Sequence, residues 1–166
     1  GRARETAMTG YVRATVAGGD GNRIAAMAAD VCGHADAGAT ALREAKYAWA
    51  GQLRASGDRD QALKLYKELA SDVKTREGSE AAYYVIEALF ESGDLDKTES
   101  EVFAFSDREP NAYWLAKAFL LLGDVYVRKG DTFQARATYQ SVADGYSPAD
   151  DGIVDEAKER IAKLKN

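Results

Sequence analysis

Cysteine, histidine and proline are scarce in this chain of 166 residues, which has one cysteine, one histidine and two prolines. A single cysteine excludes an intramolecular disulfide. It also excludes tetrahedral zinc sites built from cysteine and histidine, because these need four ligands. The rarity of proline and the abundance of alanine favour helix throughout, and no alternating run of β-branched residues predicts a strand. The sequence therefore predicts an all-α fold.

Long apolar runs and a surplus of positive charge are missing as well. The longest apolar run, residues 118–122, is far shorter than the roughly 20 residues that span a bilayer, so we expect no membrane insertion. The formal net charge is −5, and basic and acidic residues alternate along the chain. Nucleic-acid-binding proteins concentrate Lys and Arg on one face, so the sequence argues against a nucleic-acid partner.

What the chain does have is a repeat marked by glycine–aspartate pairs. The pairs Gly19-Asp20, Gly57-Asp58, Gly93-Asp94 and Gly130-Asp131 follow one another at spacings of 38, 36 and 37 residues. Glycine suits the left-handed residue that ends many helices, and the aspartate can accept hydrogen bonds from the amides of the next helix. The pattern predicts repeated units of helix, tight turn and helix. A fifth pair, Gly123-Asp124, is off this period and is expected within a helix.

The last repeat shows the clearest arrangement of small and large residues. Gly123 and Ala135 are expected to let paired helices approach closely, and larger side chains are expected to fill the gaps between repeats. These larger residues are Phe119, Leu122, Tyr126 and Tyr139. In this order the residues resemble the tetratricopeptide repeat. The resemblance implies a right-handed superhelical stack of antiparallel helix hairpins, a TPR-like α-solenoid.

On this pattern the chain is expected to be a single domain, residues 1–166. Residues 1–38 would form a degenerate or truncated hairpin, 39–75 a repeat, 76–110 a degenerate repeat and 111–148 a further repeat. In the degenerate repeat, Thr98 replaces the packing alanine and Ile86 replaces the first glycine. Because the chain begins without methionine, we expect it to be a fragment of a longer protein.

The segment 151–166 is predicted to be a C-terminal capping helix. Ile153, Ala157, Ile161 and Leu164 form one apolar stripe, and Glu156 can pair with Arg160 one turn later. A stack of hairpins needs such a helix to cover its last hydrophobic surface. We interpret this helix as a natural end of the protein.

A second resemblance rests on residues 122–126, 134–140 and Tyr146-Ser147-Pro148. In this stretch the chain is similar to the C-terminal regions of large tetratricopeptide proteins of Bacteroidetes. It is also similar to periplasmic tetratricopeptide domains of the Tol–Pal and outer-membrane-assembly systems. The resemblance implies a bacterial protein of the periplasm or cell envelope that binds other envelope proteins.

No pattern in the sequence predicts catalysis, a cofactor or a metal site. Cys32 and His34 lie close together, but we interpret Cys32 as a buried thiol and His34 as a solvated residue between helices. The glycine-rich stretch 18–22 lacks the Lys-Ser/Thr of a phosphate-binding loop and is expected to be a turn. Four aspartates near the C-terminus lack the spacing of a calcium loop and are interpreted as helix caps; they are Asp144, Asp150, Asp151 and Asp155.

The resemblance places the first helix of each hairpin on the concave face of the stack. Groove residues expected on these helices are Tyr47, Arg54, Tyr83, Glu87, Phe90, Leu120, Asp124 and Arg128. Such a groove binds extended peptides or helices. Acidic and aromatic side chains would reject a carboxylate guest, so we expect a basic or apolar segment. An alternative remains open, in which these residues pack on an adjacent domain or face water.

Two functional hypotheses follow. The first is a non-catalytic interaction scaffold that binds a peptide or helix of a partner protein in the concave groove. The second is a purely structural end-cap of a longer solenoid, or a module that self-associates into a homo-oligomer. An enzyme would need clustered acid and base residues, and the carboxylates here lie at expected caps and solvated faces.

Overall fold

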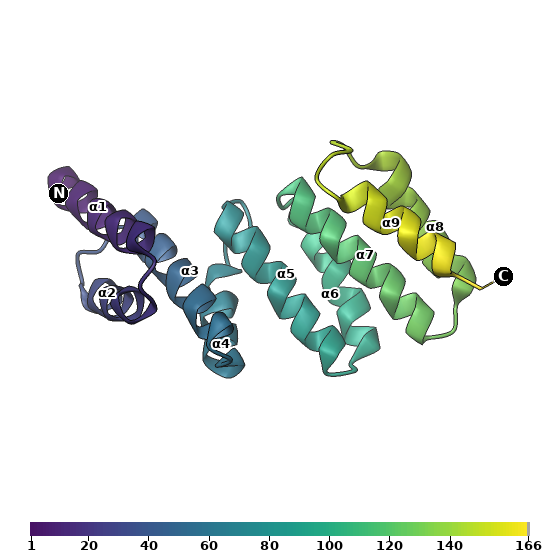
Figure 1. Ribbon diagram of the computed structural model, residues 1–166, viewed down its shortest axis with the longest axis horizontal. Coiled ribbons are helices and arrows are strands. Elements are labelled where there is room, and N and C mark those ends of the chain that lie inside the picture. Colours follow the sequence, from purple (N-terminus) through teal and green to yellow (C-terminus); the bar gives the residue numbers. More distant parts are fainter. Residues whose placement is uncertain (166) are drawn as a thin grey trace. The chain divides into compact units, whose positions relative to one another are not determined.

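The computed structural model describes residues 1–165, which form nine α-helices and no strand (Figure 1). Consecutive helices pack against each other within two compact units, Gly1–Ser71 and Asp72–Asn166. The predicted all-α class is therefore confirmed. Asn166, the last residue of the predicted capping segment 151–166, lies outside the described residues.

The first unit contains α1 (Arg2–Gly18), α2 (Gly21–Gly33), α3 (Ala39–Ala55) and α4 (Arg59–Leu69). Helices α1, α2 and α3 enclose a core of mostly small side chains. Its buried members are Val12, Met27, Ala28, Val31, Ala41 and Ala45. At the surface, the Arg13 guanidinium donates to both carboxylate oxygens of Glu44 at 3.0–3.2 Å and joins α1 to α3.

The second unit contains α5 (Arg76–Glu91), α6 (Leu95–Asp107), α7 (Ala112–Arg128), α8 (Thr132–Gly145) and α9 (Ile153–Lys163). Its core is larger and includes leucine and aromatic side chains. Members below 3 % exposure include Val102, Phe105, Leu120, Leu122, Val125, Tyr139 and Ile153. Helix α7 lies at the centre of the unit, because it contacts α5, α6, α8 and α9.

The four glycine–aspartate pairs form the turns that the sequence predicts. Gly19, Gly57, Gly93 and Gly130 have φ between 70° and 88°, a left-handed conformation that glycine adopts without a steric cost. Each following aspartate caps the next helix, and its side chain accepts backbone N–H bonds of 3.0–3.3 Å. Gly123-Asp124 lies inside α7, as expected.

The close contact predicted at Gly123 and Ala135 is confirmed. Ala135 is fully buried, and a Cβ atom built on Gly123 would lie only 2.2 Å from Cε1 of Tyr139. The predicted pattern of the last helix also holds at its start, where Ile153 and Ala157 are fully buried. The exposed end of this stripe is less covered, since Ile161 and Leu164 are only half-buried.

The interpretation of Cys32 as a buried thiol is wrong. Cys32 is half-buried. The buried side of α2 includes Val31, and Cys32, the next residue, lies at the edge of that side. This partial burial raises the pKa of the Cys32 thiol. His34 is solvent-exposed, as predicted, with Nε2 at 3.6 Å from a carboxylate oxygen of Asp30.

Candidate functional site

The candidate groove residues are divided between the two units. Tyr47 and Arg54 both lie on α3 of the first unit, two helical turns apart. Tyr47 is half-buried and Arg54 is exposed. The other candidates lie on α5 and α7 of the second unit, so the site described below belongs to that unit alone.

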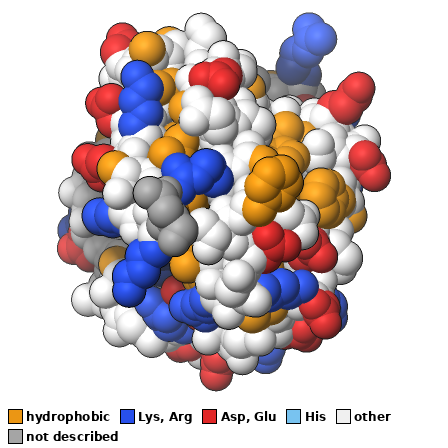
Figure 2. All heavy atoms as spheres, turned by 90° about the vertical axis from the view of Figure 1, so that its right-hand side faces the viewer, with side chains coloured by type: hydrophobic (Ala, Val, Ile, Leu, Met, Phe, Trp, Pro, Cys, Tyr) orange, Lys and Arg blue, Asp and Glu red, His pale blue; other side chains and the backbone are white. Residues whose placement is uncertain are grey.

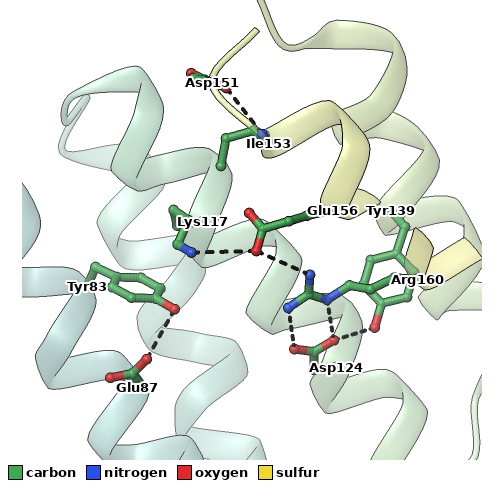
Figure 3. Close-up of polar contacts among 9 residues, drawn as sticks. All are labelled: Tyr83, Glu87, Lys117, Asp124, Tyr139, Asp151, Ile153, Glu156 and Arg160. Atoms are coloured by element: carbon green, nitrogen blue, oxygen red, sulfur yellow. Dashed lines mark hydrogen bonds and ion pairs between the residues drawn. The ribbon is translucent and has the colours of Figure 1, made fainter. Parts of the chain in front are cut away.

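In the second unit, α5 and α7 are the first helices of the two hairpins, and α9 is the helix that follows the hairpins. They lie side by side, with α7 in contact with both neighbours (Figure 1). Figure 3 shows that polar side chains of α7 and α9 meet across the junction of these two helices, and that Tyr83 and Glu87 of α5 lie beside them. We call this surface the α5–α7–α9 face, and define it by Tyr83, Glu87, Lys117, Asp124, Glu156 and Arg160.

Two of the predicted groove residues are buried. Leu120 is 1 % exposed, so its expected place on a binding surface is wrong: at this position α7 turns its side chain into the core. Tyr83, one repeat earlier, is 8 % exposed, and its hydroxyl donates a 3.3 Å hydrogen bond to Glu87. Burial and the neighbouring carboxylate of Glu87 raise the pKa of Tyr83, so the phenol stays protonated and can donate.

Asp124 lies on the α5–α7–α9 face, but its carboxylate is already engaged (Figure 3). It accepts a hydrogen bond from the Tyr139 hydroxyl of α8. It also accepts two bonds from the Arg160 guanidinium of α9, of 3.0 Å to Oδ1 and 3.4 Å to Oδ2. Asp124 therefore joins three helices, which indicates a structural role for this candidate.

Phe90 and Arg128, two of the predicted groove residues, contact each other. The guanidinium carbon of Arg128 lies 4.0 Å from the centre of the Phe90 ring, a cation–π distance. Arg128 also donates a 3.4 Å hydrogen bond to the Phe90 carbonyl. Phe90 is half-buried and Arg128 is exposed, so the pair connects α5 to α7 at the surface.

Sequence reasoning missed an aromatic cluster at the amino-terminal end of α7. The Trp114 ring centre lies 5.5 Å from that of Tyr83, 5.8 Å from that of Tyr84 and 5.0 Å from that of Tyr113. Tyr84, Tyr113 and Trp114 are all half-buried, so their edges reach solvent. The doublets Tyr83-Tyr84 and Tyr113-Trp114 were the available signal, since adjacent residues of a helix point about 100° apart and two neighbouring aromatic rings extend beyond a narrow buried stripe.

Charged groups adjoin this cluster on α7 and α9. The Lys117 ammonium lies 5.9 Å from the centre of the Tyr83 ring and 3.8 Å from Oε1 of Glu156. Glu156 also lies 3.8 Å from Arg160, the i,i+4 pair that the sequence predicts. Partial burial raises the pKa of Tyr113, and the carboxylates of Glu156, Asp151 and Glu80 raise it further.

Among residues 1–165, no group of three or more histidine, cysteine, aspartate and glutamate side chains is placed to hold a metal ion. None of the helices in this part of the chain is both long and apolar enough to cross a membrane. Figure 2 shows one side of the second unit, where acidic and basic side chains are interspersed with small hydrophobic patches.

A comparison with known families identifies one repeat in this unit. Residues 117–147 match the model of the tetratricopeptide repeat family. The match supports a tetratricopeptide repeat. It covers most of α7 and all of α8, including the Gly123–Tyr139 contact, and it includes Lys117 and Asp124 of the α5–α7–α9 face. No curated protein and no solved structure matches the chain.

Proposed function

We propose that the protein is a non-catalytic interaction scaffold that binds a peptide or helix of a partner protein on the first helices of its hairpins. The observation that carries the proposal is the aromatic cluster at the α5–α7 junction, where Tyr84, Tyr113 and Trp114 pack around the buried Tyr83 and their edges reach solvent beside a tetratricopeptide repeat. Partly exposed aromatic side chains are enriched at protein interfaces, because they bury a large area at a small entropic cost.

The proposed surface differs from the predicted groove in both the residues that it drops and those that it adds. Of the candidates it keeps the five others on the second unit, Tyr83, Glu87, Phe90, Asp124 and Arg128, and we propose Tyr47 and Arg54, on α3 of the first unit, as a separate surface. The proposed surface omits Leu120, which is buried. Tyr84, Tyr113, Trp114 and Lys117 are added, since they lie at the same junction of α5 and α7. Tyr83 and Asp124 contribute by holding their neighbours in place.

Affinity capture with matched variants tests this function. The immobilised chain is exposed to a lysate of the source organism as the wild type, as a Trp114→Leu/Phe90→Ala variant and as a Phe133→Ala control. Phe133 is an aromatic residue of α8 that is 83 % exposed and belongs to neither the cluster nor the face. We expect a protein that the wild type and the control retain and the double variant loses. Equal retention by all three would contradict the proposed face.

A second candidate function is self-association, or the capping of a longer solenoid. It is favoured by exposed hydrophobic side chains in the second unit, Phe133 at 83 % and Phe103 and Val127 at 46 %. Sedimentation over a range of concentrations separates the two functions. A mass that rises with concentration and falls back to the monomer in a Phe133→Ser variant would favour self-association.

We also propose the bacterial cell envelope, with the periplasm as the compartment. This rests on the resemblance of residues 122–126 and 134–140 to envelope tetratricopeptide proteins. Fractionation of the source cells, with detection of the full-length protein by an antibody, tests the compartment. Recovery in the cytoplasmic fraction alone would reject it.

A further inference from the structure

One buried polar side chain of α5 lies next to the aromatic cluster without belonging to it. Ser79 is fully buried, and Tyr83 follows one helical turn later on the same side of the helix. We infer that Ser79 is a positioning residue, which holds the start of α7 against α5 and so places Tyr113 and Trp114 beside Tyr83. Its importance for partner binding rests on the proposed function, whereas its effect on the cluster is independent of any partner.

The Ser79 hydroxyl joins the segments that precede two helices. It donates a 2.6 Å hydrogen bond to the carbonyl of Val73, in the segment before α5. It also accepts a 2.9 Å bond from the backbone N–H of Asn111, the residue before α7. A buried hydroxyl is costly without partners, and its removal would leave both of these backbone groups without their bond to it. The start of α7 is therefore attached to α5 through one buried side chain.

Asn111 connects Ser79 to the aromatic residues of α7. Asn111 is the N-cap of this helix, and its side-chain oxygen accepts bonds from the backbone N–H groups of Tyr113 and Trp114, at 3.0 and 3.4 Å. An N-cap fixes the first turn of the helix that follows it. The two aromatic residues of α7 are thus positioned by the residue whose backbone Ser79 holds.

The rings meet one turn further along both helices. Tyr83 lies four residues after Ser79, Trp114 lies three residues after Asn111, and the two ring centres are 5.5 Å apart. Helices α5 and α7 are therefore joined at two successive turns, first by the polar contact and then by the aromatic one. A displacement of α7 at the first contact would move the Trp114 ring relative to the Tyr83 ring.

A second contact joins the same two segments at the surface. The Lys74 ammonium donates a 3.1 Å bond to the carbonyl of Glu109 and lies 3.4 Å from its carboxylate. Glu109 has φ of 54°, a left-handed conformation that is unfavourable for a residue with a Cβ atom. Both side chains are exposed, and exposed ion pairs contribute little to stability. We therefore assign the main attachment to the buried hydroxyl of Ser79.

The neighbouring junction of the face is built differently. Ala116 of α7 lies 37 residues after Ser79 and is buried, but it has no hydroxyl. Helices α7 and α9 are joined by the charged pair of Asp124 and Arg160 instead. The serine contact is therefore not a general feature of these helices, and it occurs at the junction that carries the aromatic cluster.

NMR on the whole chain tests the positioning role. In the wild type, the backbone N–H of Asn111 should be protected from hydrogen exchange, although Asn111 itself is an exposed residue. Ser79→Ala should speed this exchange about tenfold, the size of one buried hydrogen bond. With 5-fluorotryptophan at both tryptophans, the ¹⁹F signal of Trp114 should shift in Ser79→Ala, and that of Trp49 in the first unit should not.

Thr98→Val is the matched control. Thr98 of α6 is also fully buried, and its hydroxyl donates a 2.7 Å bond to the carbonyl of Asp94, the N-cap of the same helix. The control removes a buried hydroxyl from the same unit, but that hydroxyl does not join two helices. Both the exchange at Asn111 and the ¹⁹F signal of Trp114 should keep their wild-type values.

The outcomes separate the positioning role from the scaffold function. Rapid exchange of the Asn111 N–H in the wild type would overturn the role, and this measurement decides even where Ser79→Ala does not fold. An unchanged Trp114 signal in Ser79→Ala, or an equal shift in Thr98→Val, would overturn it as well. A wild type that retains no protein in the affinity capture would count against the scaffold function alone, because the NMR measurements need no partner.

Discussion

Hairpins α5–α6 and α7–α8 have the same type of turn between their two helices. The turn is Gly93-Asp94 in the first hairpin and Gly130-Asp131 in the second, 37 residues later. The same offset pairs Ile86 with Gly123 and Val102 with Tyr139, and all four positions are buried. In α7–α8 the glycine faces a tyrosine, whereas in α5–α6 an isoleucine is combined with a valine. The larger side chain of the pair lies on the second helix in α7–α8 and on the first helix in α5–α6, so the core is filled in both hairpins.

The polar contacts of the two hairpins differ for the same reason. Glu87 and Asp124 are equivalent carboxylates, and each accepts a hydrogen bond from a tyrosine. Because Val102 has no hydroxyl, Glu87 takes its bond from Tyr83 of its own helix. Asp124 takes its bond from Tyr139 of α8 and two more from Arg160 of α9. The residue at this position therefore decides whether a tyrosine of the second helix donates to the carboxylate, as Tyr139 does to Asp124.

The largest expected effect is at Gly123. A Gly123→Ile substitution should lower the free energy of unfolding by about 3 kcal/mol, because even a Cβ would meet the buried Tyr139 ring at 2.2 Å. Urea denaturation measures the loss. The double variant Gly123→Ile/Tyr139→Val, which copies the α5–α6 pair, should recover part of it. A double variant no better than the sum of its single changes would mean that the two pairs are not equivalent.

A smaller effect separates the two carboxylates. Asp124→Asn should cost about 2 kcal/mol, since it weakens the charge-assisted bonds from Arg160 and Tyr139 in a half-buried site. Glu87→Gln should cost less than Asp124→Asn, because the hydrogen bond from Tyr83 is long, at 3.3 Å, and joins two residues of the same helix. Equal losses, measured by the same denaturation, would contradict the comparison.

The hairpins should also differ in alkali. Burial, together with Glu99 and Asp131, raises the pKa of Tyr126 to about 12, and the equivalent residue of α5 is the non-ionising Leu89. A raised folded pKa means that the stabilisation is complete below the unfolded pKa of about 10 and is lost as the pH rises toward 12. Stability should therefore fall from pH 10 to pH 12, and less steeply in Tyr126→Phe. Denaturation at several pH values checks this, with absorbance at 295 nm reporting the ionisation.

The smallest effect tests what the hairpins share. Asp94→Ala removes the cap on the amide of Lys97 and should cost about 1 kcal/mol, whereas Asp94→Asn should keep the cap and cost a few tenths. Asp131→Ala should act in the same direction on the amide of Gln134. If Asp94→Asn were as harmful as Asp94→Ala, charge rather than capping would be the source of the stability.

The α5–α7–α9 face was only partly predictable. Helical spacing marked Phe90 and Arg128, which do form a surface pair, but it also marked Leu120 and Tyr83, which are buried. Spacing along one helix shows which residues share a side. It does not show which side a neighbouring helix covers. Arg160 and Glu156 were predicted as a pair within one helix, and their contacts with Asp124 and Lys117 depend on the docking of α9 against α7.

The sequence by itself determined the helices and their turns, because a left-handed glycine and a capping aspartate act through the backbone of adjacent residues. It also marked Gly123 and Ala135 as the small residues of a close helix pair, whereas it did not identify Tyr139 as the residue that packs on Gly123. The aromatic cluster, the half-burial of Cys32 and the three-helix junction at Asp124 were decided by the tertiary structure alone. The contacts of these features involve residues up to 36 positions apart in the sequence, and such residues meet only through the packing of separate helices.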